Sequence, residues 1–566
     1  MSRRSPSTSL SLALTAAAAA TALTGCLEHP VKQVEYDQAI VLDPVTLIEP
    51  NRDVDVLFVI DNSGSMAEEQ ALVAKNFQAF IGELDLVDAN YRIGIVTTDN
   101  GNPRDPNAVF DAGDLRLSSC LGRVDDGEFV YYDFDAAFAC TDHCQLTDAD
   151  LEIRPTTSDS SDDPDKEAVA RPWLERLYSE TNLGGGVSIA EAFGCYGPQG
   201  VNGAGFESPL EAMYRGLAKA SEPGSDNFGF LRDNAHLAVV FITDEVDCSF
   251  NPDFVEIFRD NTTFWSDPDA PIPTSAVCWN AGTKCEGPGP VYAGCEPADY
   301  DVSGAAAASA DDAVLFPIDR YVDLLEEIRA KKANEGTKVM VAALAGVPQG
   351  FADGAAPIPY ADSADSEDQK EYGIGAGCTF NLDDADPTND SLARPPVRLR
   401  ELAEAFPIDE QSDYPGLYSI CQDDYTPALR DIAEQVKAQF TPGCIAACVK
   451  DTNRETDVLD PNCQVWESND DGTERNDIAE CEFKGGAWED PSGTGLCYAL
   501  LTDASGVTTD ADDDMSVDAG TGEALCAAHG NVEVMILRTK APRDGWRVKA
   551  TCELEADVES YCPNLK

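Results

Sequence analysis

The sequence predicts a doubly wound α/β fold with a mostly parallel sheet. Two observations support it: uninterrupted apolar runs that have the length of strands, and amphipathic helical patterns that alternate with them. The runs lie at 54–60, 91–97, 236–243 and 338–345, and the helical patterns at 73–84, 210–218, 318–328 and 429–440. Consecutive apolar positions are typical of parallel strands buried on both faces. Alternating them with helices favours a sheet covered by helices on both sides.

Three stretches interrupt this alternation, at about 99–200, 246–315 and 347–423. They are rich in Gly, Pro, Asp and Cys, and we expect them to be insertions at the loop ends of the sheet, pinned by disulfides. The α/β domain is therefore expected to span 51–441. Residues 442–566 hold eight cysteines and short strand-like runs, which predicts a small disulfide-rich, mostly β module.

The N-terminus has the layout of an export signal. Arg3 and Arg4 precede an apolar run, Leu10 to Ala22, that is too short to span a bilayer. The run ends in Leu-Thr-Gly-Cys, which resembles a bacterial lipobox. That resemblance implies a signal peptide at 1–25, lipidation of Cys26 and a lipid-anchored tether at 26–50. Leu27, where a retained lipoprotein would carry Asp, implies the outer membrane of a Gram-negative cell envelope.

Cysteine content and charge limit the class of protein. Of nineteen cysteines, eighteen remain once Cys26 is set aside, enough for nine disulfides in an oxidising compartment. Only four histidines are present, which disfavours zinc sites. A net charge of -64 argues against nucleic acid and anionic lipid surfaces as partners. The acidic clusters at 159–165 and 510–514 lack the EF-hand pattern and are expected to be solvated loops.

A set of oxygen-bearing side chains follows the first predicted strand, where the chain reads Asp61-Asn-Ser63-Gly-Ser65-Met. A loop between a buried parallel strand and a helix is where open α/β sheets bind ligands. One carboxylate and two hydroxyls are hard ligands of low total charge, which suits Mg²⁺. The alternative is that Ser63 or Ser65 only caps the following helix.

A second carboxylate, Asp244, follows the strand at 236–243 in the segment Ile-Thr-Asp. Together the two motifs resemble the von Willebrand factor type A (vWA) family, across the core of 51–441 without the insertions. The resemblance implies a Rossmann-like vWA fold and a metal-ion-dependent adhesion site. In that site Asp61, Ser63 and Ser65 would form the first ligand loop, and Asp244 the last ligand, often through a water.

The family also contributes a threonine from a middle loop, and here the sequence departs from the pattern. Counting six residues back from Met213 leads to Glu207, with Ser208 beside it. Glu207 as a ligand would weaken the attraction for an incoming carboxylate and widen the metal choice towards Ca²⁺ or Mn²⁺. Ser208 would keep the family form. A third alternative is that both residues only begin a helix.

Three further acids lie near the predicted site. Asp99, Glu245 and Asp247 either orient metal-bound water or belong to solvated loops. The sequence alone leaves both interpretations open.

The predicted function is metal-dependent binding of a protein that presents Asp or Glu to the metal, and not catalysis. No Gly-x-Ser-x-Gly, His-Glu-x-x-His or His/Cys arrangement is present. Two alternatives remain: a structural envelope protein whose metal only stabilises the fold, and, less favoured, a metal-assisted hydrolase.

Overall fold

The computed structural model describes residues 46–48 and 51–565. Gaps in the second range fall at 88, 106–109, 158–167, 178–179, 333–336, 382–389, 409–415, 441, 457, 470–472, 486, 505, 510, 518–523, 527–529, 539–545 and 564. The expected signal peptide, Cys26 and most of the tether lie outside the described residues, as does the whole acidic cluster at 159–165. Within the described ranges, no helix combines the length and the apolar character that crossing a bilayer requires.

A seven-stranded, mostly parallel sheet forms the centre of the fold, in the order β14-β11-β8-β2-β3-β6-β7. Its first five strands are parallel, and β6 and β7 add an antiparallel edge. The bounds are β2 (Asp53–Ile60), β3 (Asn90–Thr97), β6 (Leu174–Leu177), β7 (Glu180–Thr181), β8 (His236–Ile242), β11 (Val339–Ala345) and β14 (Gly416–Ser419). The four predicted core strands are therefore confirmed.

Three strands of this sheet come from stretches that the sequence indicated as insertions. β6 and β7 lie within 99–200, and β14 lies within 347–423. Each has four residues or fewer, and β6 (Leu-Glu-Arg-Leu) carries two charged side chains. One of these charges, Glu175, is buried because Arg92 of β3 pairs with it at 2.7 Å. Strands of four residues or fewer that include charged or polar side chains give no continuous apolar run, so hydrophobic periodicity misses them.

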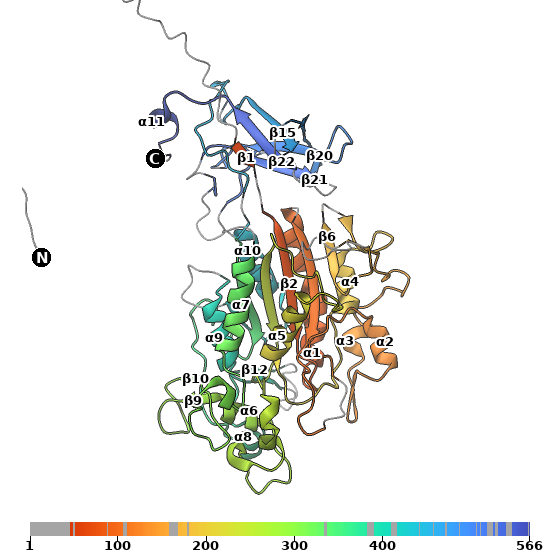
Figure 1. Ribbon diagram of the computed structural model, residues 1–566, viewed down its shortest axis with the longest axis vertical. Helices are drawn as coiled ribbons and strands as arrows, with labels where there is room; N and C mark the ends of the chain where they lie inside the picture. Colours follow the sequence, from red (N-terminus) through yellow and green to blue (C-terminus); the bar gives the residue numbers. More distant parts are fainter. Residues whose placement is uncertain are drawn as a thin grey trace, which may run out of the picture. The chain divides into compact units, whose positions relative to one another are not determined.

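Helices cover both faces of the sheet (Figure 1). One face packs against α1 (Ala67–Leu86), α4 (Ile189–Tyr196) and α10 (Thr426–Ala438). The other packs against α5 (Pro209–Ala220), α7 (Asp319–Lys331) and α9 (Val397–Ala405). Strand β2 alternates accordingly: Phe58 belongs to the first core, and Leu57 and Val59 belong to the second. The predicted doubly wound arrangement is thus present.

The remaining elements are short and lie in the connections and in the C-terminal segment. The other helices are α2 (Cys120–Asp125), η1 (Pro252–Phe258), η2 (Thr262–Phe264), α3 (Phe138–Thr141), α6 (Ala276–Gly282), η3 (Ala310–Asp312), α8 (Ser366–Tyr372) and α11 (Val558–Tyr561). Paired strands of the connections are β4 (Val130–Tyr131) with β5 (Phe134–Asp135), β9 (Thr283–Cys285) with β10 (Cys295–Pro297), and β12 (Cys378–Asn381) with β13 (Asp390–Ala393).

The regular structure of the described C-terminal segment consists of short strands and one short helix, α11, joined by long irregular stretches. A four-stranded sheet has the order β1-β22-β15-β16 and a three-stranded sheet the order β17-β20-β21, with β18 and β19 paired beside them. Their bounds are β1 (Thr46–Ile48), β15 (Cys463–Asn469), β16 (Arg475–Asp477), β17 (Ala479–Glu480), β18 (Glu482–Lys484), β19 (Ala487–Glu489), β20 (Leu496–Leu501), β21 (Glu533–Arg538) and β22 (Trp546–Cys552). Strand β1 comes from the region of the expected tether.

Nine disulfides join all eighteen cysteines of the described chain, as the cysteine count predicts. Five lie within 51–441: Cys120–Cys140, Cys144–Cys195, Cys248–Cys278, Cys285–Cys295 and Cys378–Cys421. Four lie within 442–566: Cys444–Cys526, Cys448–Cys562, Cys463–Cys552 and Cys481–Cys497. No disulfide connects the two ranges. This content is consistent with an oxidising compartment.

The strand order reverses between β2 and β8. The chain leaves β2 for β3 on one side of it, whereas β8, the neighbour on the other side, is followed by β11 and then β14. A reversal of this kind separates the two connections at the carboxyl ends of the strands, and open α/β sheets bind ligands in the resulting crevice. The predicted ligands Asp61 and Asp244 follow these two strands.

Candidate metal centre

Strand register brings three loops to the same edge of the sheet. Ile60, the last residue of β2, pairs with Thr97 of β3 and with Ile242 of β8. The backbone continues this pairing, because the Asp61 amide donates to the Ile242 carbonyl at 2.9 Å and the Thr98 amide to the Ile60 carbonyl at 3.1 Å. Asp61, Thr98 and Thr243 therefore begin their loops side by side.

The Asp-x-Ser-x-Ser loop folds back onto its own aspartate. Ser63 donates its amide to Asp61 Oδ1 at 2.8 Å, and Thr243 donates its hydroxyl to Asp61 Oδ2 at 2.5 Å. The hydroxyl oxygens of Ser63 and Ser65 are 3.2 Å apart. Adjacent ligands of an octahedral ion with bonds of about 2.1 Å are separated by about 3 Å. The two hydroxyls thus have the spacing of neighbouring ligands.

Helix capping does not explain the two serines. The residue before α1 is Met66, and no side chain caps the helix there. The loop continues into α1 through backbone hydrogen bonds, including one from the Met66 amide to the Ser63 carbonyl.

The middle loop separates the roles of its two candidate residues. Ser208 donates its hydroxyl to the Cys248 carbonyl at 2.7 Å, and it makes no side-chain cap on α5. Glu207 is fully buried and accepts a hydrogen bond from the Thr98 hydroxyl on Oε2, while its Oε1 has no hydrogen-bond partner. Glu207 therefore has a free oxygen in this loop, whereas the hydroxyl of Ser208 is engaged.

Several buried polar atoms without a hydrogen-bond partner lie in the loops at this edge of the sheet. They include Asn62 Oδ1, both amide atoms of Asn100, Glu207 Oε1 and Asp244 Oδ1. Leaving one buried polar group unsatisfied costs about 1–3 kcal/mol. Four such side chains in neighbouring loops fit a site that receives a ligand, and the carboxylate oxygens among them fit a cation.

Among the described residues, the buried acids Asp61, Glu207 and Asp244 also lack a basic side chain that would balance their charge. Within the described part of the chain, no ion pair reaches Asp61, Glu207 or Asp244. Burial raises the pKa of Asp61, although hydrogen bonds from Thr243 and Ser63 oppose it. Burial and the Asp61 carboxylate raise the pKa values of Glu207 and Asp244 well above normal. A hydrogen bond from Ser65 lowers the pKa of Asp244 in part, which connects Asp244 to the first ligand loop.

The other three acids differ in their surroundings. Asp247 is committed to the fold, since it accepts hydrogen bonds from the Leu210 amide and the Ser249 hydroxyl and pairs with Arg398 at 2.8 Å. Asp99 accepts from the Gly101 amide at 2.9 Å, and burial raises its pKa. Burial and the Asp61 carboxylate raise the pKa of Glu245 to about 8. Asp99 and Glu245 thus border the candidate site.

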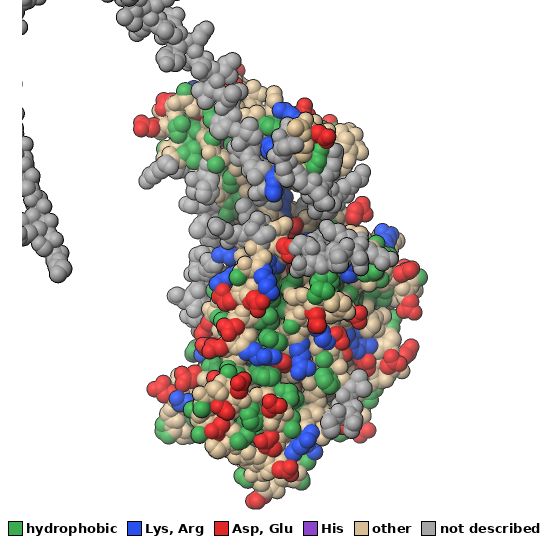
Figure 2. Space-filling model, in the orientation of Figure 1, with side chains coloured by type: hydrophobic (Ala, Val, Ile, Leu, Met, Phe, Trp, Pro, Cys, Tyr) green, Lys and Arg blue, Asp and Glu red, His purple; other side chains and the backbone are tan. Residues whose placement is uncertain are grey.

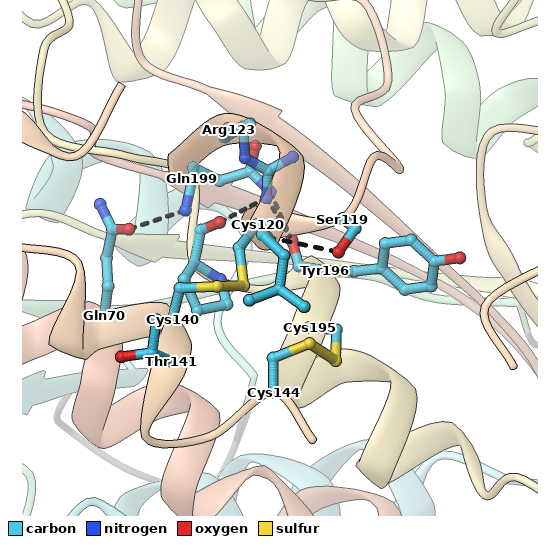
Figure 3. The surroundings of a disulfide bond; sticks show 12 residues. Gln70, Ser119, Cys120, Arg123, Cys140, Thr141, Cys144, Cys195, Tyr196 and Gln199 are labelled. Atoms are coloured by element: carbon cyan, nitrogen blue, oxygen red, sulfur yellow. Dashed lines mark hydrogen bonds between the residues drawn. A yellow bond between two sulfur atoms is a disulfide. The ribbon is translucent and has the colours of Figure 1, made fainter. Parts of the chain in front are cut away.

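A network of polar contacts connects the first ligand loop, which begins at Asp61, to helix α1 and to the segment 198–200. Gln70 of α1 donates to the carbonyls of Asp61 and Gly200, both at 2.8 Å, and accepts from the Gln199 amide at 2.7 Å. Arg123 donates to the Pro198 carbonyl in the same segment, and the disulfides Cys120–Cys140 and Cys144–Cys195 lie beside it (Figure 3).

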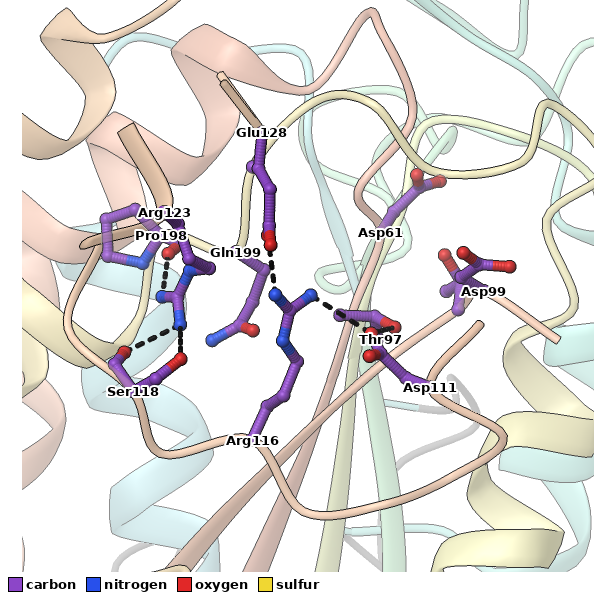
Figure 4. Close-up of polar contacts among 12 residues, drawn as sticks. Asp61, Thr97, Asp99, Asp111, Arg116, Ser118, Arg123, Glu128, Pro198 and Gln199 are labelled. Atoms are coloured by element: carbon purple, nitrogen blue, oxygen red, sulfur yellow. Dashed lines mark hydrogen bonds and ion pairs between the residues drawn. The ribbon is translucent and has the colours of Figure 1, made fainter. Parts of the chain in front are cut away.

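A second arginine ties the strand end to the nearby insertion. Arg116 lies between Asp111, at 3.0 Å, and Glu128, at 2.5 Å, and Asp111 also accepts from the Thr97 hydroxyl at 2.6 Å (Figure 4). Asp61 and Asp99 lie at the strand ends in the same view.

Thr98, Thr243 and Gln70 are not among the site residues that the sequence predicts. Thr243 stands in the Ile-Thr-Asp segment and Thr98 directly follows the second strand, so a hydroxyl at a strand end was the available signal. Gln70 gave no such signal, because its role depends on contacts with residues distant in sequence.

A separate group of acids lies in the C-terminal segment. Carboxylate oxygens of Asp503, Asp513 and Asp514 all lie within 4.8 Å of one another, whereas among the described residues no three carboxylates around Asp61 do so. The sequence placed Asp513 and Asp514 in a solvated acidic loop and missed Asp503, which is buried. Asp503 and Asp513 receive hydrogen bonds from Thr508, so their oxygens have partners within the loop.

Comparison with known proteins does not assign the chain to a family. No protein-family model matches it, and no curated protein is similar to it at a significant level. Among solved structures, it is similar to the pilus adhesin SpaC from Lactobacillus rhamnosus GG in its open conformation, with a TM-score of 0.26 and 8% identity over 92% of this chain. A second structure of that adhesin gives 0.26 and 9% over 90%. The chain spans 41% of the adhesin's length in both.

Proposed function

We propose that this chain is an exported, lipid-anchored envelope protein with a vWA-type domain that binds a protein partner through a divalent metal. The ligand set is Asp61, Ser63 and Ser65, with Glu207 from the middle loop and Asp244 directly or through a water. The lipid anchor at Cys26 and the outer-membrane location belong to the same proposal and rest on the sequence motif.

One observation carries the proposal: buried carboxylates with uncompensated charge meet paired serine hydroxyls at the switch point of a parallel sheet. Asp61, Glu207 and Asp244 are at most 5% exposed, and no basic side chain among the described residues pairs with them. Burying charge without a partner is costly, and the costs here fall on a few neighbouring side chains. A divalent cation relieves all of them together.

The donor set favours Mg²⁺ and leaves room for Mn²⁺ or Ca²⁺. The oxygens offered by carboxylates and hydroxyls are the hard ligands that all three ions accept. When bound, the ion supplies one open coordination position that a partner's Asp or Glu completes. Glu207 in place of the family's threonine adds a negative charge to the site, so the chain's own residues tune it towards tighter metal binding and weaker attraction of the partner's carboxylate.

Metal titration combined with partner capture tests the proposal. Calorimetry with MgCl₂ and with MnCl₂ should give one binding event for the full chain, and Asp61→Asn should abolish it. The full chain on beads should then capture a partner from envelope extract in Mg²⁺ but not in chelator, and Asp61→Asn should capture nothing.

Two results contradict the proposal in different ways. Capture that is equal in Mg²⁺ and chelator removes the metal from recognition. Metal binding that raises thermal stability with no metal-dependent capture favours the structural alternative, in which the ion only stabilises the loop edge.

A further inference from the structure

An exposed aromatic hairpin stands beside the candidate metal loop. Strands β4 and β5 and the turn between them place four large apolar or aromatic side chains at the surface: Val130 (46% exposed), Tyr131 (43%), Tyr132 (87%) and Phe134 (43%). The rings of Tyr131 and Tyr132 contact edge to face, with centroids 4.7 Å apart. Contiguous exposed apolar side chains of this kind are typical of interaction surfaces.

The hairpin touches the ligand loop directly. A Cβ atom built on Gly64, between the two serine ligands, would fall 2.5–2.7 Å from three ring atoms of Tyr131. The ring therefore lies against the bare backbone of the loop at Gly64. A protein segment that contacts Ser63 and Ser65 has this hairpin within reach.

Backbone contacts fix the hairpin to the site. The Val201 amide donates to the Glu128 carbonyl at the hairpin base at 2.8 Å, and the Gly200 carbonyl accepts from Gln70, which also holds the Asp61 carbonyl. Arg116 forms an ion pair with the Glu128 carboxylate at 2.5 Å. The Cys120–Cys140 disulfide closes the segment that contains the hairpin. A surface fixed in this way loses little conformational entropy when a partner binds.

Charge restricts what can bind there. Glu245 and the exposed Glu371 act electrostatically on Tyr131, so acids border the aromatic surface. Acidic side chains are also spread over the visible face of the molecule (Figure 2), in keeping with a net charge of -64. An acidic partner, including a second copy of this chain, would be repelled, since like charges suppress association.

Building on the proposed function, we propose that the aromatic hairpin determines specificity at the metal site. Its occupant is a loop of a partner protein in which one Asp or Glu is flanked by Lys or Arg. The acidic residue reaches the metal. The flanking cations lie on the faces of Tyr131 and Tyr132 and near the exposed Glu371, where cation–π and ionic contacts favour them.

Synthetic peptides of defined charge test this inference. Biotinylated peptides carry a central Asp flanked by Lys, by Gln or by Glu, and a fourth carries Asn between lysines. Their binding to the full chain is measured by interferometry in Mg²⁺ and in chelator at low salt. We expect the Lys-Asp-Lys peptide to bind best and only with Mg²⁺, and the preference for lysine to weaken as salt rises.

Variants separate the hairpin from the metal. Tyr132 has a positive φ of 51°, which asparagine tolerates, so Tyr132→Asn removes the ring without straining the turn. It should weaken Lys-Asp-Lys binding about two- to fivefold, the size of an exposed cation–π contact, with calorimetric Mg²⁺ affinity matching the wild type. Leu86→Ala, an exposed apolar change at the far end of α1 (77% exposed), is the matched control and should bind as the wild type.

The outcomes distinguish this inference from the proposed function. If the wild type binds Mg²⁺ but shows no flank preference, or Tyr132→Asn binds like Leu86→Ala, the hairpin inference is overturned alone. If the wild type binds no Mg²⁺, both proposals fail together.

Discussion

Strand β2 carries one buried carboxylate inside the sheet, Asp55, and a second just past its end, Asp61, and the fold treats them in opposite ways. Asp55 pairs with Arg232, whose side-chain Nε and backbone amide each donate to it at 2.7 Å. Asp61 receives only neutral donors, from Ser63 and Thr243. Both are 0% exposed. The contrast shows that this protein can supply an internal cation where stability requires one, and that at the carboxyl edge it supplies none.

The largest expected effect concerns the paired carboxylate. Arg232→Met leaves Asp55 buried without its cation, so we expect the free energy of unfolding to fall by about 3–5 kcal/mol. Denaturant unfolding, with and without Mg²⁺, measures the loss. Arg329→Met, at a half-exposed arginine that pairs with Glu326, is the control and should change stability little. Equal stabilities of the two variants would show that the Asp55 pair is not structural.

The next effect concerns the unpaired carboxylate. Asp61→Asn keeps the shape of the side chain and removes its charge, so we expect Mg²⁺ affinity to fall by about 100-fold or more. In chelator its thermal midpoint should equal or exceed that of the wild type, because an uncompensated buried charge is gone. Asp55→Asn, the same change within the strand, should do the reverse and lower stability. Strong destabilisation by Asp61→Asn in chelator would show that the Asp61 carboxylate stabilises the fold as Asp55 does, against the contrast drawn between them.

A smaller effect distinguishes the two residues of the middle loop. Glu207→Gln removes a charged oxygen that has no partner, so we expect calorimetric Mg²⁺ affinity to fall about tenfold. Ser208→Ala removes a hydroxyl already bonded to the Cys248 carbonyl, so affinity should stay within about twofold while stability falls by about 1 kcal/mol. The opposite ranking of the two affinities would make Ser208 the ligand.

The smallest effect is a pH dependence of the metal-free protein. Burial raises the pKa values of Asp61, Glu207 and Asp244, and raises that of Glu245 to about 8. The unfolded chain ionises these groups near pH 4. Between about pH 4 and 8 the folded protein therefore holds more protons than the unfolded chain does. Its free energy of unfolding is highest below this window and falls as pH rises through it.

Thermal unfolding in chelator at pH 5, 6.5 and 8 measures this loss, at roughly 2–4 °C per kcal/mol. The double variant Asp61→Asn, Glu207→Gln should show a shallower fall, which separates the site from the general charge of the chain. Saturating Mg²⁺ should also reduce the fall, since the cation binds the ionised forms. A midpoint that rises with pH in the wild type would count against buried acids of raised pKa.

Sequence patterns predict the parts of this fold whose signal is local. The strands β2, β3, β8 and β11 are continuous apolar runs, and their strand ends place Asp61 and Asp244 at one edge. Strands β6 and β14 are not predicted, because each has only four residues, and the burial of Glu175 in β6 depends on an ion pair with Arg92, which is far away in the sequence.

The candidate site also has a part that the sequence predicts and a part that it does not. Asp61, Ser63 and Ser65 are adjacent in sequence, so a motif identifies them. The choice between Glu207 and Ser208 depends on their hydrogen bonds. Ser208 donates its hydroxyl to the Cys248 carbonyl, and Glu207 accepts from Thr98 on one oxygen only. Both partners are far away in the sequence, so no local pattern reveals these bonds. The aromatic hairpin is predicted by no periodicity, since its position over Gly64 arises from tertiary contacts alone.

Anomalous diffraction from crystals grown with MnCl₂ would show whether a metal binds at Asp61, Ser63 and Ser65. We expect an anomalous peak at the carboxyl edge of the sheet, within about 2.2 Å of the hydroxyl oxygens of Ser63 and Ser65 and adjacent to Asp61. That peak should be absent from Asp61→Asn crystals grown in the same way. Crystals that show no peak there, or a peak only at Asp503, Asp513 and Asp514, would contradict the proposed metal site.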